Sequence, residues 1–347
     1  MQLFEIMINM GFPKHIVALL QGLYSEHTAV IKWNNESTKP FKIGKGVRQG
    51  CIISPRLFTL YTEQVMRETE LEEFGVCSGG RTITDMRYAD DTLLIVDGRK
   101  NPSDALRKLD NAGRKRHLTL NSKKTKAMFT CRPDNVSVDL NGEAIEVVSK
   151  FKYLGSIKTE NADCGIDIKA RVAMGKKRML DLTPIWKDRG IRKEVKLRIL
   201  QALVWPVITY GSEAWTLKKA EAKRIDAAEM WIYRRLLRVS WRARRSNRSI
   251  LAELGTQRQL LTLVKRRKLV NFGHLCRGEG LPRDVVVGYH PGTRRRGRPR
   301  RQFSDDIREW TGLSLSGAVQ LARNRTVWRA LAKRSAEGGP SSNSGPP

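Results

Sequence analysis

The stretch "RYADDTLLIV", Arg87–Val96, sets two acidic residues, Asp90 and Asp91, between an aromatic residue and an apolar, strand-forming run. Side chains on a strand alternate between the faces of a sheet, so adjacent acids can serve one site only at a turn. We therefore expect a hairpin with both carboxylates at its tip. Carboxylates bind hard cations such as Mg²⁺. A polar β-turn explains the pair equally well, because Asp favours turns.

Three other stretches suit a phosphate-rich ligand. In "GKGVRQGCIISPRLFTLY" the glycines allow a ligand to approach the backbone closely, and Arg48 and Gln49 suit a base or a phosphate. "LNSKKTK" places three lysines beside a turn. "FKYLGS" places Phe151 and Tyr153 around a lysine, an arrangement suited to holding a strand of nucleic acid.

The charge of the chain is strongly positive and unevenly distributed. Of the 65 Lys and Arg and 35 Asp and Glu residues, the first 100 positions hold 12 of each, so the other 247 positions carry the whole net charge of +30. This asymmetry favours a nucleic-acid partner over an anionic membrane surface. A length of 347 residues and 40% hydrophobic residues allow about two domains with real cores.

Targeting signals and metal motifs are not evident. The first residues, "MQLFEIMINMGF", lack the basic start of a signal peptide, and no apolar run is long enough to span a bilayer. The five cysteines are scattered, and His274, Cys276 and His290 do not have zinc spacing. We expect an intracellular protein, in the nucleus or the cytoplasm, with free thiols and no membrane partner.

The pattern of apolar and turn residues predicts an α+β chain. Two short helices are expected around a break at Gly11–Pro13, then a hairpin turning at "NNES", then a helix with Ser54 as its cap and Pro55 in its first turn. Another helix, a polar turn and short strands follow the acidic hairpin. From about Ile166 long helical stretches dominate, and "EGGPSSNSGPP" should be a disordered tail.

"GVRQGCIISPRLFTLY", "YADD", "LNSKKTK" and "FKYLGS" resemble, in this order, motifs B, C, D and E of reverse transcriptases, in particular those of non-LTR (LINE-type) retrotransposons of the RTE/BovB kind. The resemblance extends over nearly the whole chain and implies RNA-directed DNA polymerase ancestry. It also implies the fold: a partial right-hand palm with an antiparallel sheet and helices, then a helical thumb and a basic helical C-terminal region. Residues 1–157 would be partial fingers and palm, 158–255 the thumb, 256–336 a basic nucleic-acid-binding region and 337–347 the tail.

The resemblance also implies roles for single residues. Asp90 matches the metal-binding aspartate of the palm and Asp91 its acidic neighbour, so both would hold Mg²⁺ in a two-metal site. Lys124 matches the lysine proposed to protonate the departing pyrophosphate, with Lys123 and Lys126 as bystanders.

Two segments would contact the template, the primer or the nucleotide. Gln49 and Gly50, next to Arg48, match positions that border the incoming nucleotide and the template. The primer grip would be formed by Phe151, Lys152, Tyr153, Leu154 and Gly155. The implied partners are an RNA template and a DNA primer.

The family needs one more carboxylate, the aspartate of motif A, which precedes the helix matching "LFEIMINMGFPKHI". That residue, fingers sequence and an endonuclease domain are expected before Met1. Glu5 falls inside an apolar helical pattern and is not expected to substitute. Because a two-metal site clamps both the attacking and the leaving oxygen, we expect the 347-residue chain alone to be inactive or nearly so.

An alternative is a non-catalytic nucleic-acid-binding protein acting through "TRRRGRPRRQ", Thr293–Gln302. Its core resembles an AT-hook, which would lie in the narrow minor groove of AT-rich DNA. We favour the simpler interpretation, a linker that contacts phosphates without sequence preference, or a nuclear import signal. The arginines concerned are Arg294, Arg295, Arg296, Arg298, Arg300 and Arg301.

A second acidic pair, Asp305 and Asp306, follows Ser304, a candidate helix cap. Acids in a first helical turn interact favourably with the helix dipole, and no strand flanks this pair. We therefore expect a structural role. The oligomeric state is left open by the sequence.

Overall fold

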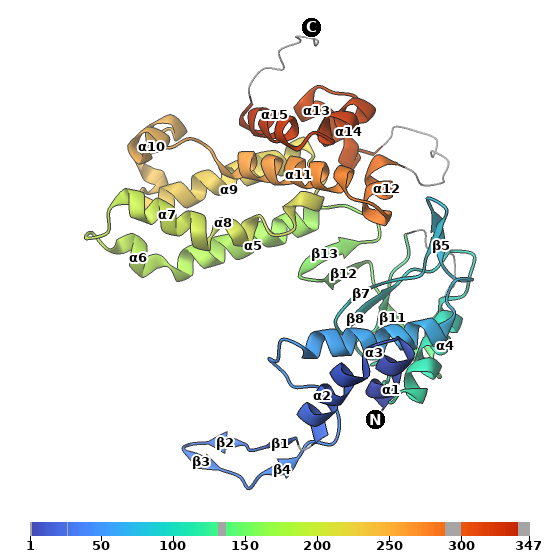
Figure 1. Cartoon of the computed structure of the whole chain (residues 1–347). Helices are drawn as coiled ribbons and strands as arrows, with labels where there is room; N and C mark the ends of the chain where they lie inside the picture. Colours follow the sequence, from blue (N-terminus) through green and yellow to red (C-terminus); the bar gives the residue numbers. More distant parts are fainter. Residues whose placement is uncertain (1, 26, 131–136, 289–299, 339–347) are drawn as a thin grey trace. The chain divides into compact units, whose positions relative to one another are not determined.

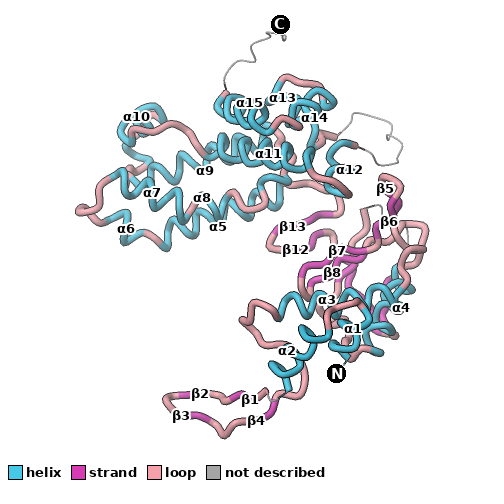
Figure 2. Tube along the Cα trace, viewed as in Figure 1, coloured by secondary structure: helices cyan, strands magenta, loops and turns pink. Residues whose placement is uncertain are grey.

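The computed structural model describes residues 2–25, 27–130, 137–288 and 300–338, which fall into two compact units (Figures 1 and 2). The N-terminal unit comprises Met1–Cys77, Arg81–Ala127 and Pro133–Val147. The C-terminal unit comprises Ser78–Gly80, Met128–Arg132 and Val148–Pro347. Each unit is described by itself.

The helices of the N-terminal unit are α1 (Gln2–Asn9), α2 (Lys14–Ser25), α3 (Ser54–Thr69) and α4 (Pro102–Lys115). The expected break between the first two helices is confirmed. Met7, Val17 and Leu57 bury one apolar cluster between α1, α2 and α3. Further clusters between α3 and α4 include Val65 and Leu109, so α3 joins the two halves of this core.

The expected cap of α3 was wrong in detail. Ser54 is the first residue of the helix, and its hydroxyl lies 3.2 Å from the hydroxyl of Tyr24. The preceding position, Ile53, has no side-chain oxygen to accept a capping hydrogen bond. Pro55 does occupy the first turn, where its missing N–H costs nothing.

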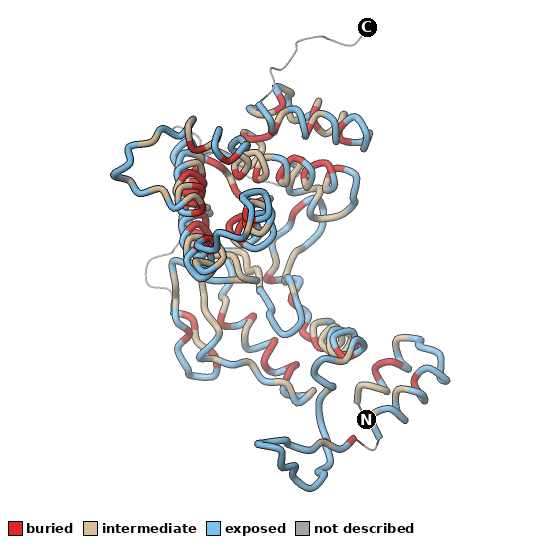
Figure 3. Tube along the Cα trace, turned by 90° about the vertical axis from the view of Figure 1, so that its left-hand side faces the viewer, coloured by how far each residue is buried: buried red, intermediate tan, exposed pale blue. Residues whose placement is uncertain are grey.

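The strands of the N-terminal unit are short and mostly form antiparallel hairpins: β1 (Thr28–Ala29) with β4 (Phe41–Lys42), β2 (Lys32–Trp33) with β3 (Glu36–Ser37), β5 (Val76–Ser78) with β6 (Arg81–Ile83), and β7 (Asp85–Tyr88) with β8 (Asp91–Leu94). The expected turn at "NNES" is confirmed. A three-stranded sheet adds one parallel pair, in the order β10 (Val138–Leu140), β11 (Glu143–Val147), β9 (Lys126–Ala127). The β1–β4 ribbon is exposed along most of its length (Figure 3).

The C-terminal unit is helical, as the sequence predicts, apart from the hairpin of β12 (Lys150–Tyr153) and β13 (Ser156–Thr159) and part of the β5–β6 turn. Its large core is built around buried residues such as Ile168, Trp205, Ile225 and Val264. The helices are α5 (Gly165–Asp181), α6 (Thr183–Lys187), α7 (Lys193–Leu203), α8 (Trp205–Ile208), α9 (Lys219–Leu236), α10 (Asn247–Leu254), α11 (Leu260–Arg277) and α12 (Leu281–Val287), with the 3-10 helices η1 (Ser212–Ala214) and η2 (Trp241–Ala243).

The remaining helices, α13 (Phe303–Thr311), α14 (Leu315–Ala322) and α15 (Arg325–Glu337), pack on the second half of α11. The expected cap of α13, Ser304, was wrong. Gln302 is the cap, and its own backbone N–H donates to the Asp305 carboxylate at 2.7 Å. The structural role expected for the acidic pair fits this arrangement. None of the helices in the described parts of the chain is both long and apolar enough to cross a membrane.

Candidate active site

The acidic stretch forms the expected hairpin. Tyr88 pairs with Asp91 across the two strands, and Ala89 and Asp90 form the turn between them. Ala89 has φ +53°, in the left-handed region, at a cost of about 1–2 kcal/mol for a residue with a Cβ atom. The strands therefore reverse over two residues, which puts one carboxylate in the turn and the next at the start of β8.

The hairpin has one supported face and one open face. The side chains of Asp85 and Arg87 lie on the supported side, and Leu94 there packs against the α3–α4 core. The alternation of the strand places Asp91 on the opposite face together with Tyr88, which is 67% exposed. Asp90 and Asp91 are both exposed, and neither carboxylate is paired with another residue in the described parts of the chain.

A charged network anchors the supported face to α3. The Arg87 guanidinium contacts Asp85 at 2.8 Å and Glu63 at 2.7 Å, and Glu63 also pairs with Arg67 at 2.9 Å. The hydrogen bonds from Arg87 and then Arg67 hold the pKa of Glu63 below its ordinary value. The network fixes the hairpin without using either carboxylate of the acidic pair.

The donor set at the hairpin tip suits part of a metal site. Two adjacent, exposed carboxylates that carry no ion pair are hard oxygen ligands of the kind Mg²⁺ takes, usually with help from substrate phosphates. Across the described ranges, however, no group of three His, Cys, Asp or Glu side chains is close enough to hold a metal ion. Asp90 and Asp91 can therefore contribute to such a site but do not complete one.

The loop before α3 carries the residues expected to border a nucleotide. Gly46 and Gly50 have φ values of +93° and +82°, which glycine adopts without strain. Arg48 is braced against the end of α2, because its Nε donates to His27 Nε2 and a terminal nitrogen lies 3.5 Å from the carbonyl of Leu23. Gln49 is exposed. The loop thus presents Gln49 to solvent, while Arg48 fixes the loop to the end of α2.

The lysine stretch is positioned by a buried acid that the sequence did not single out. Asp110 is 1% exposed and accepts hydrogen bonds from the Leu120 N–H at 3.1 Å and the Asn141 amide at 2.7 Å. Burial acts against ionisation, but these bonds and the one from Arg114 hold its pKa below the ordinary value. The segment entering "NSKKTK" is therefore fixed at its start.

Within that stretch two lysines differ in what they contact. Lys126 pairs with Glu146 across β9 and β11. Lys124 is exposed, its backbone N–H donates to Asn121, and its ammonium makes no ion pair with a described residue. Lys124 is thus available for a phosphate, as its expected role requires.

The segment expected to grip a primer forms the β12–β13 hairpin of the C-terminal unit, so it and the acidic pair belong to different units. Phe151 and Tyr153 are half-buried and alternate with exposed Lys152. The turn residues Leu154 and Gly155 have φ values of +47° and +79°. A Cβ atom on Gly155 would stand at an ordinary contact distance of 3.4 Å from both Arg171 and Tyr210, so the turn needs glycine for its positive φ.

Residues far along the sequence hold this turn in place. The Tyr210 hydroxyl donates to the carbonyl of Leu154 at 2.8 Å, and the Arg171 guanidinium donates to the carbonyl of Gly155 while stacking 4.2 Å from the centre of the Tyr210 ring. Asp167, 2% exposed, accepts from the Ile157 N–H at 2.8 Å and from the Trp215 indole at 2.9 Å. Sequence reasoning missed these residues, because no local pattern links them to the hairpin.

A buried ion pair organises the other end of the C-terminal unit. Lys268 and Asp306 are both fully buried, 2.5 Å apart, and the ammonium also donates to the carbonyl of Trp215 at 2.7 Å. Burial lowers the pKa of Lys268, and the facing Asp306 carboxylate opposes that shift. Asp306 thus ties α13 to α11, which explains why an acid is needed at this position.

The arginines expected to bind nucleic acid are only partly described. Arg294, Arg295, Arg296 and Arg298 lie outside the described residues. Arg300 is exposed and donates to the carbonyl of Asn161 at 3.2 Å. Arg301 pairs with Asp306 at 2.7 Å and Glu309 at 2.5 Å. Its guanidinium therefore has a structural role beside the buried pair.

Comparisons with known proteins identify a family for the first part of the chain. Residues 1–157 match the family model described as reverse transcriptase (RNA-dependent DNA polymerase). A transposon-derived protein of Caenorhabditis elegans is 27% identical over 273 residues, which cover 74% of this chain and 97% of that protein. Both hairpins discussed above lie within or at the edge of the matched segment. The chain therefore carries, over residues 1–157, a reverse transcriptase domain.

Proposed function

We propose that the Asp90–Asp91 hairpin is the metal-binding part of the polymerase site of this domain, where a DNA primer is extended on an RNA template. The observation that supports this most is the open face of the β7–β8 hairpin. It carries two exposed carboxylates, while its other face is fixed to α3 by Arg87 and Glu63. Reverse transcriptases generally depend on a metal ion and bind an RNA template and a DNA primer.

The neighbouring residues would contact different parts of the substrates, namely the incoming nucleotide, the departing pyrophosphate and the primer. Gln49 and Gly50 border the incoming nucleotide, with Arg48 supporting the loop from behind. Lys124 neutralises, and can protonate, the departing pyrophosphate, because its ammonium makes no ion pair with a described residue. The Phe151–Gly155 hairpin holds the primer strand, and the helices that follow act as the thumb. We place the chain with the non-LTR, RTE-like reverse transcriptases on the same motifs.

The metal would be Mg²⁺, held by Asp90 and Asp91. When bound, such ions stabilise the charge on the attacking and leaving oxygens of an in-line displacement. Because the described residues offer two carboxylates here and such a site needs at least one more, we propose that the 347-residue chain alone is impaired in catalysis. A carboxylate supplied by another segment would complete the site.

Metal-directed cleavage tests the proposed ligands without requiring turnover. Fe²⁺ replaces Mg²⁺ in the full chain bound to a template–primer and an unreactive nucleotide, and ascorbate with peroxide then generates radicals that cut the backbone near the ion. We expect cuts close to residues 88–92 that Asp90→Asn abolishes. The matched control is Asp104→Asn, an exposed carboxylate on α4 that should leave the pattern unchanged. Cleavage elsewhere, or cuts that persist in Asp90→Asn, would refute the assignment.

A second candidate function is binding without catalysis through the basic C-terminal region. The observation in its favour is charge, because the net +30 lies entirely after residue 100. Duplex binding measured over a range of salt concentrations tests it. Equal affinity for AT-rich and GC-rich duplexes with a steep salt dependence indicates phosphate contacts alone, and a clear AT preference indicates the minor-groove hook.

A further inference from the structure

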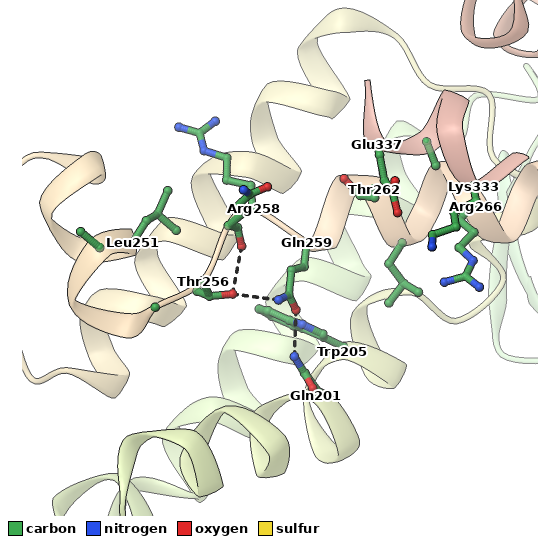
Figure 4. Close-up of a pocket in the computed structure, with 15 residues that line it drawn as sticks. Gln201, Trp205, Leu251, Thr256, Arg258, Gln259, Thr262, Arg266, Lys333 and Glu337 are labelled. Carbon is green, nitrogen blue, oxygen red and sulfur yellow. Dashed lines mark hydrogen bonds between the residues drawn. The ribbon is translucent and has the colours of Figure 1, made fainter. Parts of the chain in front are cut away.

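A cavity of about 920 Å³ lies within the C-terminal unit, between α7, α10, α11 and the end of α15 (Figure 4). Its size falls in the range of about 300–1,000 Å³ typical of pockets that hold small ligands. Apolar side chains such as Leu251 and Leu263 form part of its wall. None of the lining residues belongs to the acidic hairpin or to β12–β13, so the cavity is separate from the residues assigned above to the metal and to the primer grip.

One end of the cavity carries two side-chain amides that are already oriented. Gln259 donates to the Thr256 hydroxyl at 2.8 Å and accepts from the Gln201 amide at 2.8 Å, as the dashed lines in Figure 4 show. An amide group has two donor hydrogens and an acceptor oxygen, so each glutamine has hydrogen-bonding capacity left after these bonds. Pre-oriented amides suit the polar edge of a planar, hydrogen-bonding ligand.

A third polar group at this end has no partner at all. Trp205 lines the cavity and is only 3% exposed, and its indole N–H makes no hydrogen bond within the described structure. Buried donors are nearly always paired, and leaving one unpaired costs about 1–3 kcal/mol. Because the indole nitrogen is itself closed off from the cavity, this N–H belongs to the packed core and is not a donor for a ligand.

The other end of the cavity is basic. Figure 4 shows Arg266 and Lys333 there, on α11 and α15. Arg258, also in the wall, pairs with Asp226 at 3.3 Å, whereas Arg266 and Lys333 make no ion pair with a described residue. Glu337 is the one acidic side chain among the lining residues. The excess of positive charge favours an anionic group at this end.

We propose that this cavity binds one nucleotide of a single-stranded nucleic acid. The base lies against the apolar wall and receives hydrogen bonds from the Gln201 and Gln259 amides, while its phosphate pairs with Arg266 and Lys333. Hydrogen bonds to the edge of an unpaired base, combined with phosphate contacts, are how proteins recognise nucleotides in single strands. The helical unit would therefore retain a single strand independently of the catalytic hairpin.

Binding of short oligonucleotides to the full chain tests this proposal. The probes are fluorescein-labelled ten-residue oligouridylate and oligothymidylate, followed by fluorescence anisotropy in about 0.3 M salt to suppress non-specific phosphate contacts. Lys333→Glu is compared with Arg334→Glu, which changes the charge by the same amount at the next position of α15 but lies outside the cavity. We expect Lys333→Glu to weaken binding about tenfold and Arg334→Glu less than about twofold.

Gln201→Ala provides a second measurement that does not depend on surface charge. Gln201 is exposed and its amide bonds to Gln259, so its removal should lower the melting temperature only slightly. It should, however, reduce the stabilisation that a saturating oligonucleotide provides. Binding of either oligonucleotide with these variant effects supports the proposal, and the difference between the two probes reports on the sugar. Equal weakening by Lys333→Glu and Arg334→Glu, or undetectable binding of both probes, would overturn it.

Discussion

Removal of the buried carboxylate of Asp306 should destabilise the C-terminal unit severely. In Asp306→Ala the fully buried Lys268 ammonium keeps the carbonyl of Trp215 at 2.7 Å and the face of the Phe303 ring, whose centre is 3.9 Å away. It loses its counter-charge, and the Leu217 N–H loses its acceptor at 2.9 Å. Breaking a buried pair by removing one partner costs about 3–5 kcal/mol, because the remaining charge stays buried.

That cost can be converted into an expected melting temperature. For a unit of about 200 residues, 1 kcal/mol corresponds to about 2–4 °C, so Asp306→Ala should melt about 6–20 °C lower. The neighbouring Asp305→Ala removes only a cap contact and should cost about 0.5–2 kcal/mol, which makes it the matched control. The double variant Lys268→Met with Asp306→Ala should recover at least about 2 kcal/mol, because no charge is stranded.

Urea unfolding of the full chain, followed by tryptophan fluorescence, reports on this unit, because seven of the eight tryptophans lie after residue 185. The reasoning is refuted if Asp306→Ala costs no more than Asp305→Ala. It is equally refuted if the double variant is less stable than Asp306→Ala alone, since the penalty would then not come from an unpaired ammonium.

Three further predictions concern the same unit. Burial raises the pKa of Glu229, so the stability that its protonated carboxyl contributes is present at mildly acidic pH and is lost as pH rises through the folded-state pKa. In urea titrations between about pH 5 and 8, the unfolding free energy of Glu229→Gln should therefore rise relative to that of the wild type. A difference that stays constant with pH would contradict this. Asp167→Ala should speed amide exchange at Ile157 at least about tenfold by removing its acceptor, whereas unchanged protection would show that the turn holds without it. Gly155→Ala should cost more than about 1 kcal/mol in unfolding free energy because of its positive φ, and an unaffected midpoint would count against the strained turn.

The sequence predicts those features that depend on local pattern. Helical spacing and proline position predict α3, and the alternation around a turn predicts the β7–β8 hairpin. The acidic pair and its neighbouring motifs could be identified because each is a short contiguous segment whose residue types suggest its chemistry without any knowledge of the fold. The long helices after residue 165 follow from the same periodicity.

Features that depend on residues far apart could not be predicted. Lys268 and Asp306 are 38 positions apart. From the helical pattern alone, Lys268 would be predicted to be an exposed lysine on a basic helix. Arg301 sits in an arginine-rich run yet contacts Asp306 and Glu309. Asp167 supports a turn ten residues earlier through a backbone N–H, a contact that no side-chain pattern encodes.

Primer extension tests the central claim most directly, namely that Asp90 serves RNA-templated DNA synthesis once a further carboxylate is present. The assay compares the 347-residue chain with the same chain extended at its N-terminus by the corresponding segment of a related reverse transcriptase, aspartate included, on a primed RNA template with Mg²⁺. We predict synthesis by the extended chain that Asp90→Asn abolishes and Asp104→Asn retains, and little or none by the chain alone. Robust Asp90-dependent synthesis by the chain alone, or synthesis by the extended chain that survives Asp90→Asn, would contradict the account.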